Sequence, residues 1–196
     1  MSIELIITTA VILGLIFYLI SIYNKLVSLK NRVDNGWAQI DVQLQRRYDL
    51  IPNLVETAKG YMKHEKDTLK MVIDARNSAN DAAKAASSNP SDQNAIKDLQ
   101  ASEQKLQGAM MSFQALAEGY PDLKANTNML ALQEELATTE NKVGFSRQAF
   151  NDAVMQYNTG IEIFPNSLIA NQFKFTQATE WQIEDQEAKK NVKVTF

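Results

Sequence analysis

The sequence contains no cysteine and only one histidine, His64. Without cysteine the chain has no disulfide, thiolate zinc site, iron–sulfur cluster or thiol nucleophile. One imidazole is a poor metal site, because the di-iron pattern of helical bundles needs Glu-x-x-His twice. We therefore interpret His64 as a surface residue and expect no catalytic, metal or cofactor site.

Glycine and proline are also scarce, with 7 and 4 among 196 residues, while apolar residues make up 45%. This composition is typical of a packed, helix-rich chain and excludes disordered and collagen-like classes. Basic residues are not in excess, since the formal net charge is −3. Neutralising many phosphates needs clustered Lys and Arg, so nucleic acid is excluded as an expected partner.

One long uncharged run stands near the N-terminus, LIITTAVILGLIFYLISIY at residues 5–23. As a helix it spans about 28 Å, close to the hydrocarbon thickness of a bilayer. The run is too long for the apolar region of a signal peptide, and no small-residue cleavage pattern follows it. We predict a retained transmembrane helix, with the lipid bilayer as a partner.

Basic residues follow this run and none precedes it; the nearest are Lys25, Lys30 and Arg32. The positive-inside rule then predicts a short extracytoplasmic N-terminus at residues 1–4 and a cytoplasmic C-terminal domain. The expected location is the inner or cell membrane, crossed once.

After the span, large apolar residues recur in steps of three and four, which is the spacing of a coiled coil or helical bundle. This apolar stripe comprises Leu26, Leu29, Val33, Trp37, Ile40, Leu44, Tyr48, Ile51, Val55, Ala58 and Met62, and continues to Leu69, Val72 and Ile73. Pro52 interrupts it. Because the apolar phase survives, we favour a kink in one long helix; the alternative is a reversal into two antiparallel helices.

Two further helical stretches are predicted. Residues 74–95 contain no large apolar residue and indicate the end of the first helix and a connector. Ser91 or Asp92 can cap the second helix, and Asp122 or Asn126 starts a third that runs to about residue 163. Short connections favour antiparallel neighbours.

The predicted fold is therefore all-α. A transmembrane helix at residues 5–23 precedes an elongated antiparallel up-and-down bundle of three to four long helices at residues 24–163. A short irregular or extended C-terminal tail, with a short helix, fills residues 164–196.

The predicted helices differ in length, at roughly 90, 40 and 60 Å. Part of the apolar stripe would then have no partner in its own chain, so either Pro52 folds the helix back or another copy covers it. The second case predicts a homo-oligomer. In the tail, Val192, Val194 and Phe196 alternate as in a strand, which would lie on the bundle as a clasp or pair with a neighbouring protomer.

Four other residues are candidates for protein interaction. Arg46, Arg47 and Asp49 form a polar cluster roughly 35 Å beyond the span, too far for direct lipid contact. We favour ion pairing with an adjacent helix or protomer over a phosphate or lipid site. Trp181 lies outside the apolar stripe and is predicted to contact a partner. Three polar residues of the third stretch are interpreted as fixing helix register through hydrogen bonds: Asn151, Tyr157 and Asn158.

Several strings resemble the LemA family of bacterial membrane-anchored proteins. They are YNKLVSLKNRVDNGWAQIDVQLQRRYDLIPNLVETAKGYMKHE from residue 23, YPDLKAN from residue 120, and FNDAVMQYN followed by IEIFPNSLIA. The resemblance implies a short extracytoplasmic N-terminus, one membrane helix and a helical bundle, with no established enzymatic activity.

The expected function is a non-catalytic, membrane-anchored scaffold that self-associates and presents a cytoplasmic helical surface to other proteins. Two alternatives stay open. One is a regulatory adaptor of an integral-membrane enzyme or protease, which would make another membrane protein the partner. The other is a homo-oligomer that organises or shapes the membrane.

Overall fold

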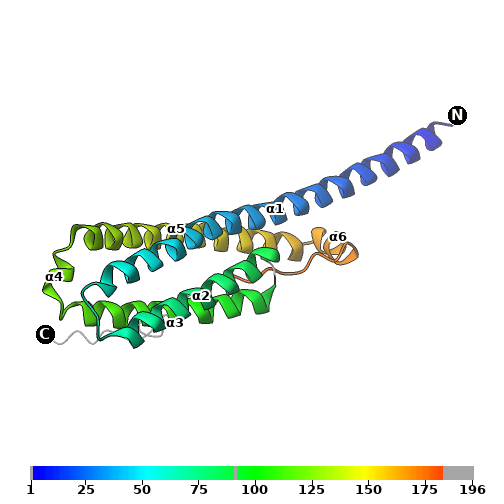
Figure 1. The fold of residues 1–196 in the computed structure, drawn as a ribbon. Coiled ribbons are helices and arrows are strands. Elements are labelled where there is room, and N and C mark those ends of the chain that lie inside the picture. Colours follow the sequence, from blue (N-terminus) through cyan, green and yellow to red (C-terminus); the bar gives the residue numbers. More distant parts are fainter. Residues whose placement is uncertain (1, 91, 183–196) are drawn as a thin grey trace, which may run out of the picture.

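The structure is a computed structural model that describes residues 2–90 and 92–182, and it confirms the all-α fold. The described residues form six helices: α1 (Ile3–Lys59), α2 (Lys66–Ser88), α3 (Gln93–Ala117), α4 (Pro121–Lys124), α5 (Thr127–Glu162) and α6 (Asn166–Gln172). The N-terminal part of α1 projects from one end of the bundle, and α6 lies at that same end (Figure 1).

The four long helices form an open array. Helix α1 packs along α5 on one side and along α2 on the other, while α3 packs on α2. Successive helices run antiparallel, and α4 joins α3 to α5 at the end far from the N-terminus (Figure 1). Helices α3 and α5 are therefore the two edges of the array.

Helix α1 is continuous over 57 residues. Its side chains are exposed from residue 3 to residue 21, and the buried stripe begins at Ile22. The exposed part is long and apolar enough to cross a membrane, by length and composition. The predicted span thus lies outside the bundle, on the same helix that forms the bundle core.

Helix α1 passes through Pro52 without reversing, so the alternative of two antiparallel helices meeting there is wrong. Proline has no N–H, which leaves the carbonyl of Tyr48 without its helical donor. Arg76 on α2 supplies the missing hydrogen bond, because its Nε donates to Tyr48 O at 2.7 Å. A neighbouring helix therefore satisfies the acceptor that the proline leaves free.

The chain instead reverses between Lys59 and Lys66, where α1 ends and α2 begins. The prediction of one helix running on through Leu69 is therefore wrong. The apolar phase survives the turn because Met62 and Leu69 both face the same core, at 0% and 5% exposure.

Because the chain reverses at this turn, its own helices cover the apolar stripe. From Leu26 to Met62 the predicted stripe residues are buried within the single chain, apart from Leu29, which is partly buried against the core. A second copy is therefore not needed to cover these residues, and the homo-oligomer stays a prediction.

A second correction concerns residues 74–95, for which the prediction is the end of the first helix and a connector. Helix α2 extends to Ser88, and beyond Val72 its buried residues are Ala79, Ala83 and Ala86. Alanine has the highest helix propensity and a small side chain, so it allows close helix packing without a large apolar residue. The connector begins only after Ser88.

The predicted helix starts are confirmed at two capping residues. Asp92 accepts a hydrogen bond from the backbone N–H of Asn94 (2.8 Å) at the start of α3. Asn126 accepts one from Met129 N (3.0 Å) at the start of α5. Such caps satisfy amides that have no partner inside the helix.

The tightest helix contact joins α1 to α5. A Cβ added to Gly36 would lie 3.2 Å from the Cα of Phe150, which is closer than an ordinary contact, so glycine favours this approach. Beside it, the ring of Trp37 contacts those of Phe150 (5.6 Å) and Trp181 (6.0 Å between centroids). Trp37 Nε1 donates to Ser87 Oγ at 3.0 Å, which satisfies its buried polar atom.

Candidate interaction groove

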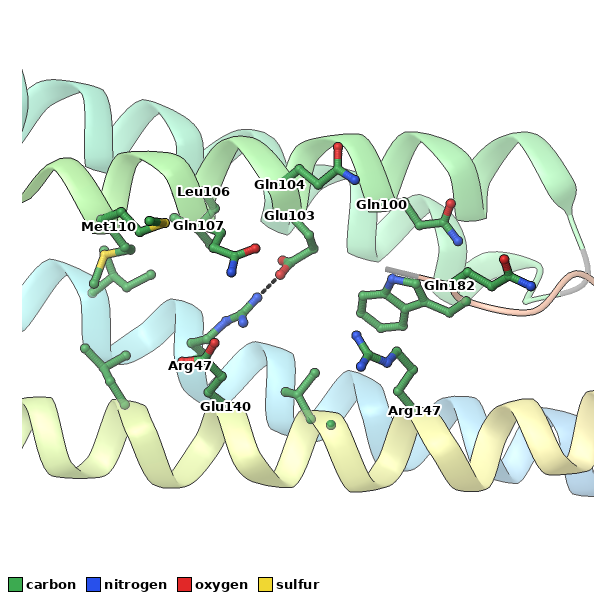
Figure 2. A pocket seen from close by; sticks show the side chains of 16 residues that line it. Arg47, Gln100, Glu103, Gln104, Leu106, Gln107, Met110, Glu140, Arg147 and Gln182 are labelled. Atoms are coloured by element: carbon green, nitrogen blue, oxygen red, sulfur yellow. Dashed lines mark hydrogen bonds and ion pairs between the residues drawn. The ribbon is translucent and has the colours of Figure 1, made fainter. Parts of the chain in front are cut away.

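A groove of about 290 Å³ lies between the edge helices α3 and α5, and α1 forms its floor (Figure 2). Its volume is at the lower end of the range of ligand pockets. The lining residues come from α1, α3, α5 and the segment after α6. They include Arg47, Gln100, Glu103, Leu106, Met110, Met111, Leu136, Glu140, Val143, Gly144, Arg147, Trp181 and Gln182.

An ion pair stands at the centre of the groove. Arg47 of α1 donates from Nη2 to Glu103 Oε2 of α3, and Tyr48 Oη donates to the other carboxylate oxygen. The side chains of Arg47 and Glu103 are only 16% and 13% exposed. The carboxylate is therefore held by two neighbouring residues of α1, which ties α3 to the floor helix.

Burial changes the proton affinity of these groups. It lowers the pKa of Arg47, while the nearby charge of Glu140 acts in the opposite direction. Burial also raises the pKa of Tyr48 to about 12. Tyr48 thus stays a neutral hydrogen-bond donor at physiological pH. Among the described residues, Arg47 Nε has no hydrogen-bond partner.

The groove is apolar at one end and polar at the other. Met110 and Leu136 lie toward the end that leads to α4, whereas Gln100, Arg147 and Gln182 lie toward the other end. Figure 2 shows Arg147 and Gln182 at that end. An apolar side chain and a polar backbone could therefore be accommodated side by side.

The segment after α6 runs into the polar end and is held along α5 by asparagines. Asn158 brackets Ala178, donating to its carbonyl and accepting from its amide, both at 2.9 Å. Asn151 brackets Trp181 in the same way at 3.0 and 2.8 Å. Tyr157 Oη donates to Thr176 O at 2.9 Å.

The spacing of these contacts explains the extended form of the segment. Seven helical residues separate the two asparagines and three extended residues separate their partners, and both rise about 10 Å. Two turns of helix therefore have the same length as three residues of extended chain. The interpretation that Asn151, Tyr157 and Asn158 hold packed elements in register agrees with these bonds, although their partner is the tail rather than another helix.

The predicted polar cluster does not form one site. Arg46 points away from the groove ion pair and contacts Glu135 of α5 at 2.5 Å. Asp49 accepts from Gln45 Nε2 at 2.9 Å and lies 3.5 Å from Arg76. Each makes ion-pair or hydrogen-bond contacts within the chain. A role of these residues in binding another protein stays a prediction.

Trp181 is 2% exposed and packs on Trp37, so it is a core contact of its own chain rather than an exposed partner contact. The apolar stripe could not reveal this, because Trp181 belongs to an extended segment outside any helix. Val192, Val194 and Phe196 lie outside the described residues.

Sequence reasoning also missed Glu103, which is 56 residues from Arg47 and carries no local signal of that pairing. His64 lies in the exposed turn between α1 and α2 instead of on a helix. In the part of the chain that the structure describes, no group of three His, Cys, Asp or Glu side chains could hold a metal ion.

Comparisons with known proteins identify a family and one relative. A family model described as the LemA family matches residues 36–196. A curated relative, Protein LemA of Metamycoplasma hominis, is 24% identical over 157 residues, which is 79% of this chain and 67% of the relative.

Proposed function

The chain belongs to the LemA family, and we propose that it is a non-catalytic, membrane-anchored scaffold that presents its helical bundle to other proteins. In this proposal residues 5–23 stay in the membrane and the bundle lies in the cytoplasm. The α3–α5 groove is the surface that binds a partner.

The continuity of α1 carries this proposal. The same helix that is exposed and apolar up to residue 21 becomes the floor of the groove at Arg47. Since Arg47 is 24 residues beyond Tyr23, the groove would stand roughly 36 Å from the bilayer along the helix. An unbroken helix supports a retained anchor, because it gives the bundle a fixed position relative to the span.

Charge supports the cytoplasmic orientation. Lys25, Lys30 and Arg32 are exposed on α1 just beyond the span, where the positive-inside rule applies. Glu4 is the charged side chain on the other side.

The groove supports binding of an extended segment. The chain already holds residues 176–181 extended along α5 through Asn151 and Asn158, and the groove continues the same path. A partner segment with an apolar side chain near Met110 and Leu136 would fit its apolar end. Self-association is not part of this proposal, because the stripe that called for a second copy is covered within the chain.

A second candidate is a regulatory adaptor of an integral-membrane enzyme or protease. The fixed distance between the groove and the bilayer favours this candidate, since a cytoplasmic segment of a partner in the same membrane would also lie at a fixed distance from the bilayer. Both candidates share the groove and differ in the identity of the partner.

Site-specific photo-crosslinking in cells tests the groove. A photoreactive amino acid replaces Met111, at the groove rim, or Val42 on α1 outside it; both side chains are 63% exposed. We expect adducts with another membrane protein from position 111 and few from position 42. An adduct of twice the chain's mass would instead indicate self-association.

Two results would contradict the proposal. Equal adducts at both positions would mean that the groove is not a preferred surface. Adducts that appear at position 111 only after residues 183–196 are deleted would mean that the chain's own C-terminal residues fill the groove.

A further inference from the structure

Four large apolar side chains are exposed where α5 ends and around α6. Phe164 is 80% exposed, Leu168 61%, Phe173 56% and Ile163 46%. We call these residues the α6 patch. Singly exposed apolar residues are ordinary, whereas a group of them on one end of a domain indicates a contact surface.

The α6 patch lies at the level where α1 leaves the bundle. Gly160 packs on α1, since a Cβ added there would lie 2.6 Å from Leu29 Cδ1 and 3.8 Å from Leu26 Cδ2. Because α5 runs antiparallel to α1, its last residue, Glu162, lies about 3 Å further toward the span, and Phe164 follows this helix end. That places it near the level of Tyr23.

Aromatic contacts confirm this level independently. The ring of Tyr23 lies 4.8 Å from that of Phe173 and 5.9 Å from that of Phe175. Tyr23 is the last residue of the uncharged run, which is where aromatic residues meet the headgroup layer. Because the two rings are in contact, the medium around Tyr23 also surrounds the exposed side of Phe173.

We propose that the α6 patch rests in the headgroup layer of the bilayer and forms a second membrane contact beside the α1 span. This rests on the proposed function, because it requires residues 5–23 to be inserted. Two contacts on one face fix the tilt of the bundle against the membrane, which a single helix does not.

The observations favour lipid over a protein partner as the occupant. Helix α6 lies at the end of the bundle from which the N-terminal part of α1 projects (Figure 1), and the apolar side chains of that part are exposed as well. Lys25 and Lys174 flank the patch and are exposed, as expected next to an anionic leaflet. The acidic neighbour Glu162 accepts a hydrogen bond from Gln177 Nε2 at 2.5 Å.

The absence of native cysteine makes spin labelling clean. Phe164→Cys and Phe145→Cys are a matched pair, since both replace phenylalanines that are highly exposed, at 80% and 74%. Phe145 lies on α5 about 25 Å further from the bilayer. The full chain is placed in nanodiscs that contain anionic phospholipid, and each nitroxide is exposed to oxygen and to a water-soluble nickel complex. Leu168→Cys serves as a second patch position.

We expect the ratio of oxygen to nickel accessibility to be higher for the labels at 164 and 168 than for the label at 145, because the headgroup layer admits less of the polar complex than water does. Nickel accessibility at 164 and 168 equal to that at 145 would overturn the patch contact. A Leu13→Cys label separates the two proposals. If it reports lipid while the patch labels report water, only the patch contact fails; if it reports water, the anchor fails as well.

Discussion

The hydrogen bond from Arg76 to the carbonyl of Tyr48 should stabilise α1 only because Pro52 is present. Arg76→Met keeps most of the side-chain stem but removes the donor that lies 2.7 Å from this carbonyl. A charged hydrogen bond to a carbonyl of this kind contributes about 1.5–3 kcal/mol. The accompanying contact with Asp49 adds little, because it is 3.5 Å long and that carboxylate is 62% exposed.

In a Pro52→Ala background the expected cost is smaller. Alanine restores the backbone N–H that donates to Tyr48 O inside the helix, so the carbonyl keeps a partner when Arg76 is replaced. Arg76→Met should then cost about 1 kcal/mol or less, which gives a coupling free energy of about 1–2 kcal/mol in a double-mutant cycle.

Urea unfolding in mild detergent measures these free energies. The two tryptophans, Trp37 and Trp181, are both buried in the bundle, so their fluorescence reports its unfolding. Lys70→Met is the control, since the pair of Lys70 with Asp74 is exposed to solvent and its loss should leave the free energy of unfolding nearly unchanged. An equal cost of Arg76→Met in both backgrounds would refute the reasoning.

Three further predictions concern packing, the tail and pH. Gly36→Ala should lower the free energy of unfolding by about 1–2 kcal/mol, because the new Cβ meets the α5 backbone at 3.2 Å. Gly108→Ala is the control: a Cβ there has nothing within 4 Å, so the change should raise the free energy of unfolding by up to about 1 kcal/mol. Thermal unfolding distinguishes the two signs. Asn151→Ala should lower the free energy of unfolding by about 1–3 kcal/mol and speed amide exchange in residues 178–181, because two hydrogen bonds to the tail are lost. Asn141→Ala, at an exposed position, should do neither. The pKa of Tyr48 is raised to about 12 in the folded chain, so the unfolded chain loses this proton at a lower pH. The free energy of unfolding should therefore be unaffected below pH 10 and fall by about 1 kcal/mol per pH unit from pH 10 to pH 12. Urea titrations at several pH values measure this loss, and Tyr48→Phe should remove it.

Sequence patterns predicted the features that depend on local chemistry. The stripe from Leu26 to Met62 follows helical periodicity, and its residues are buried almost as predicted. The starts of α3 and α5 follow from Asp92 and Asn126, whose side-chain oxygens accept hydrogen bonds from backbone amides two and three residues later. These signals lie within one helix turn, so a single sequence contains them.

The features that failed depend on contacts between distant segments. The turn after Lys59 preserves the apolar phase, so periodicity alone cannot distinguish one helix from two that face a common core. At Pro52, the carbonyl that the proline leaves free is satisfied by Arg76, 28 residues away in the sequence. The alanine face of α2 has no large apolar residue to mark it, although alanine is what allows its close packing.

The candidate groove was also beyond local patterns. Arg47 could be selected as a polar residue on a helix, but its partner Glu103 lies on a helix whose position follows from the turn after α1. Trp181 is buried because Asn151 fixes the backbone of the tail, an interaction that depends on the match between helical and extended rise.

The central claim is that α1 is a retained span that continues into a cytoplasmic bundle, and labelling of single cysteines tests it most directly. Cells that express Ser2→Cys or Met111→Cys are treated with a membrane-impermeant maleimide before and after permeabilisation, and the intact mass of each product is measured. The account predicts full-length chains, with position 2 labelled in intact cells and position 111 only after permeabilisation. Products that lack the N-terminal residues, or labelling of position 111 in intact cells, would contradict it.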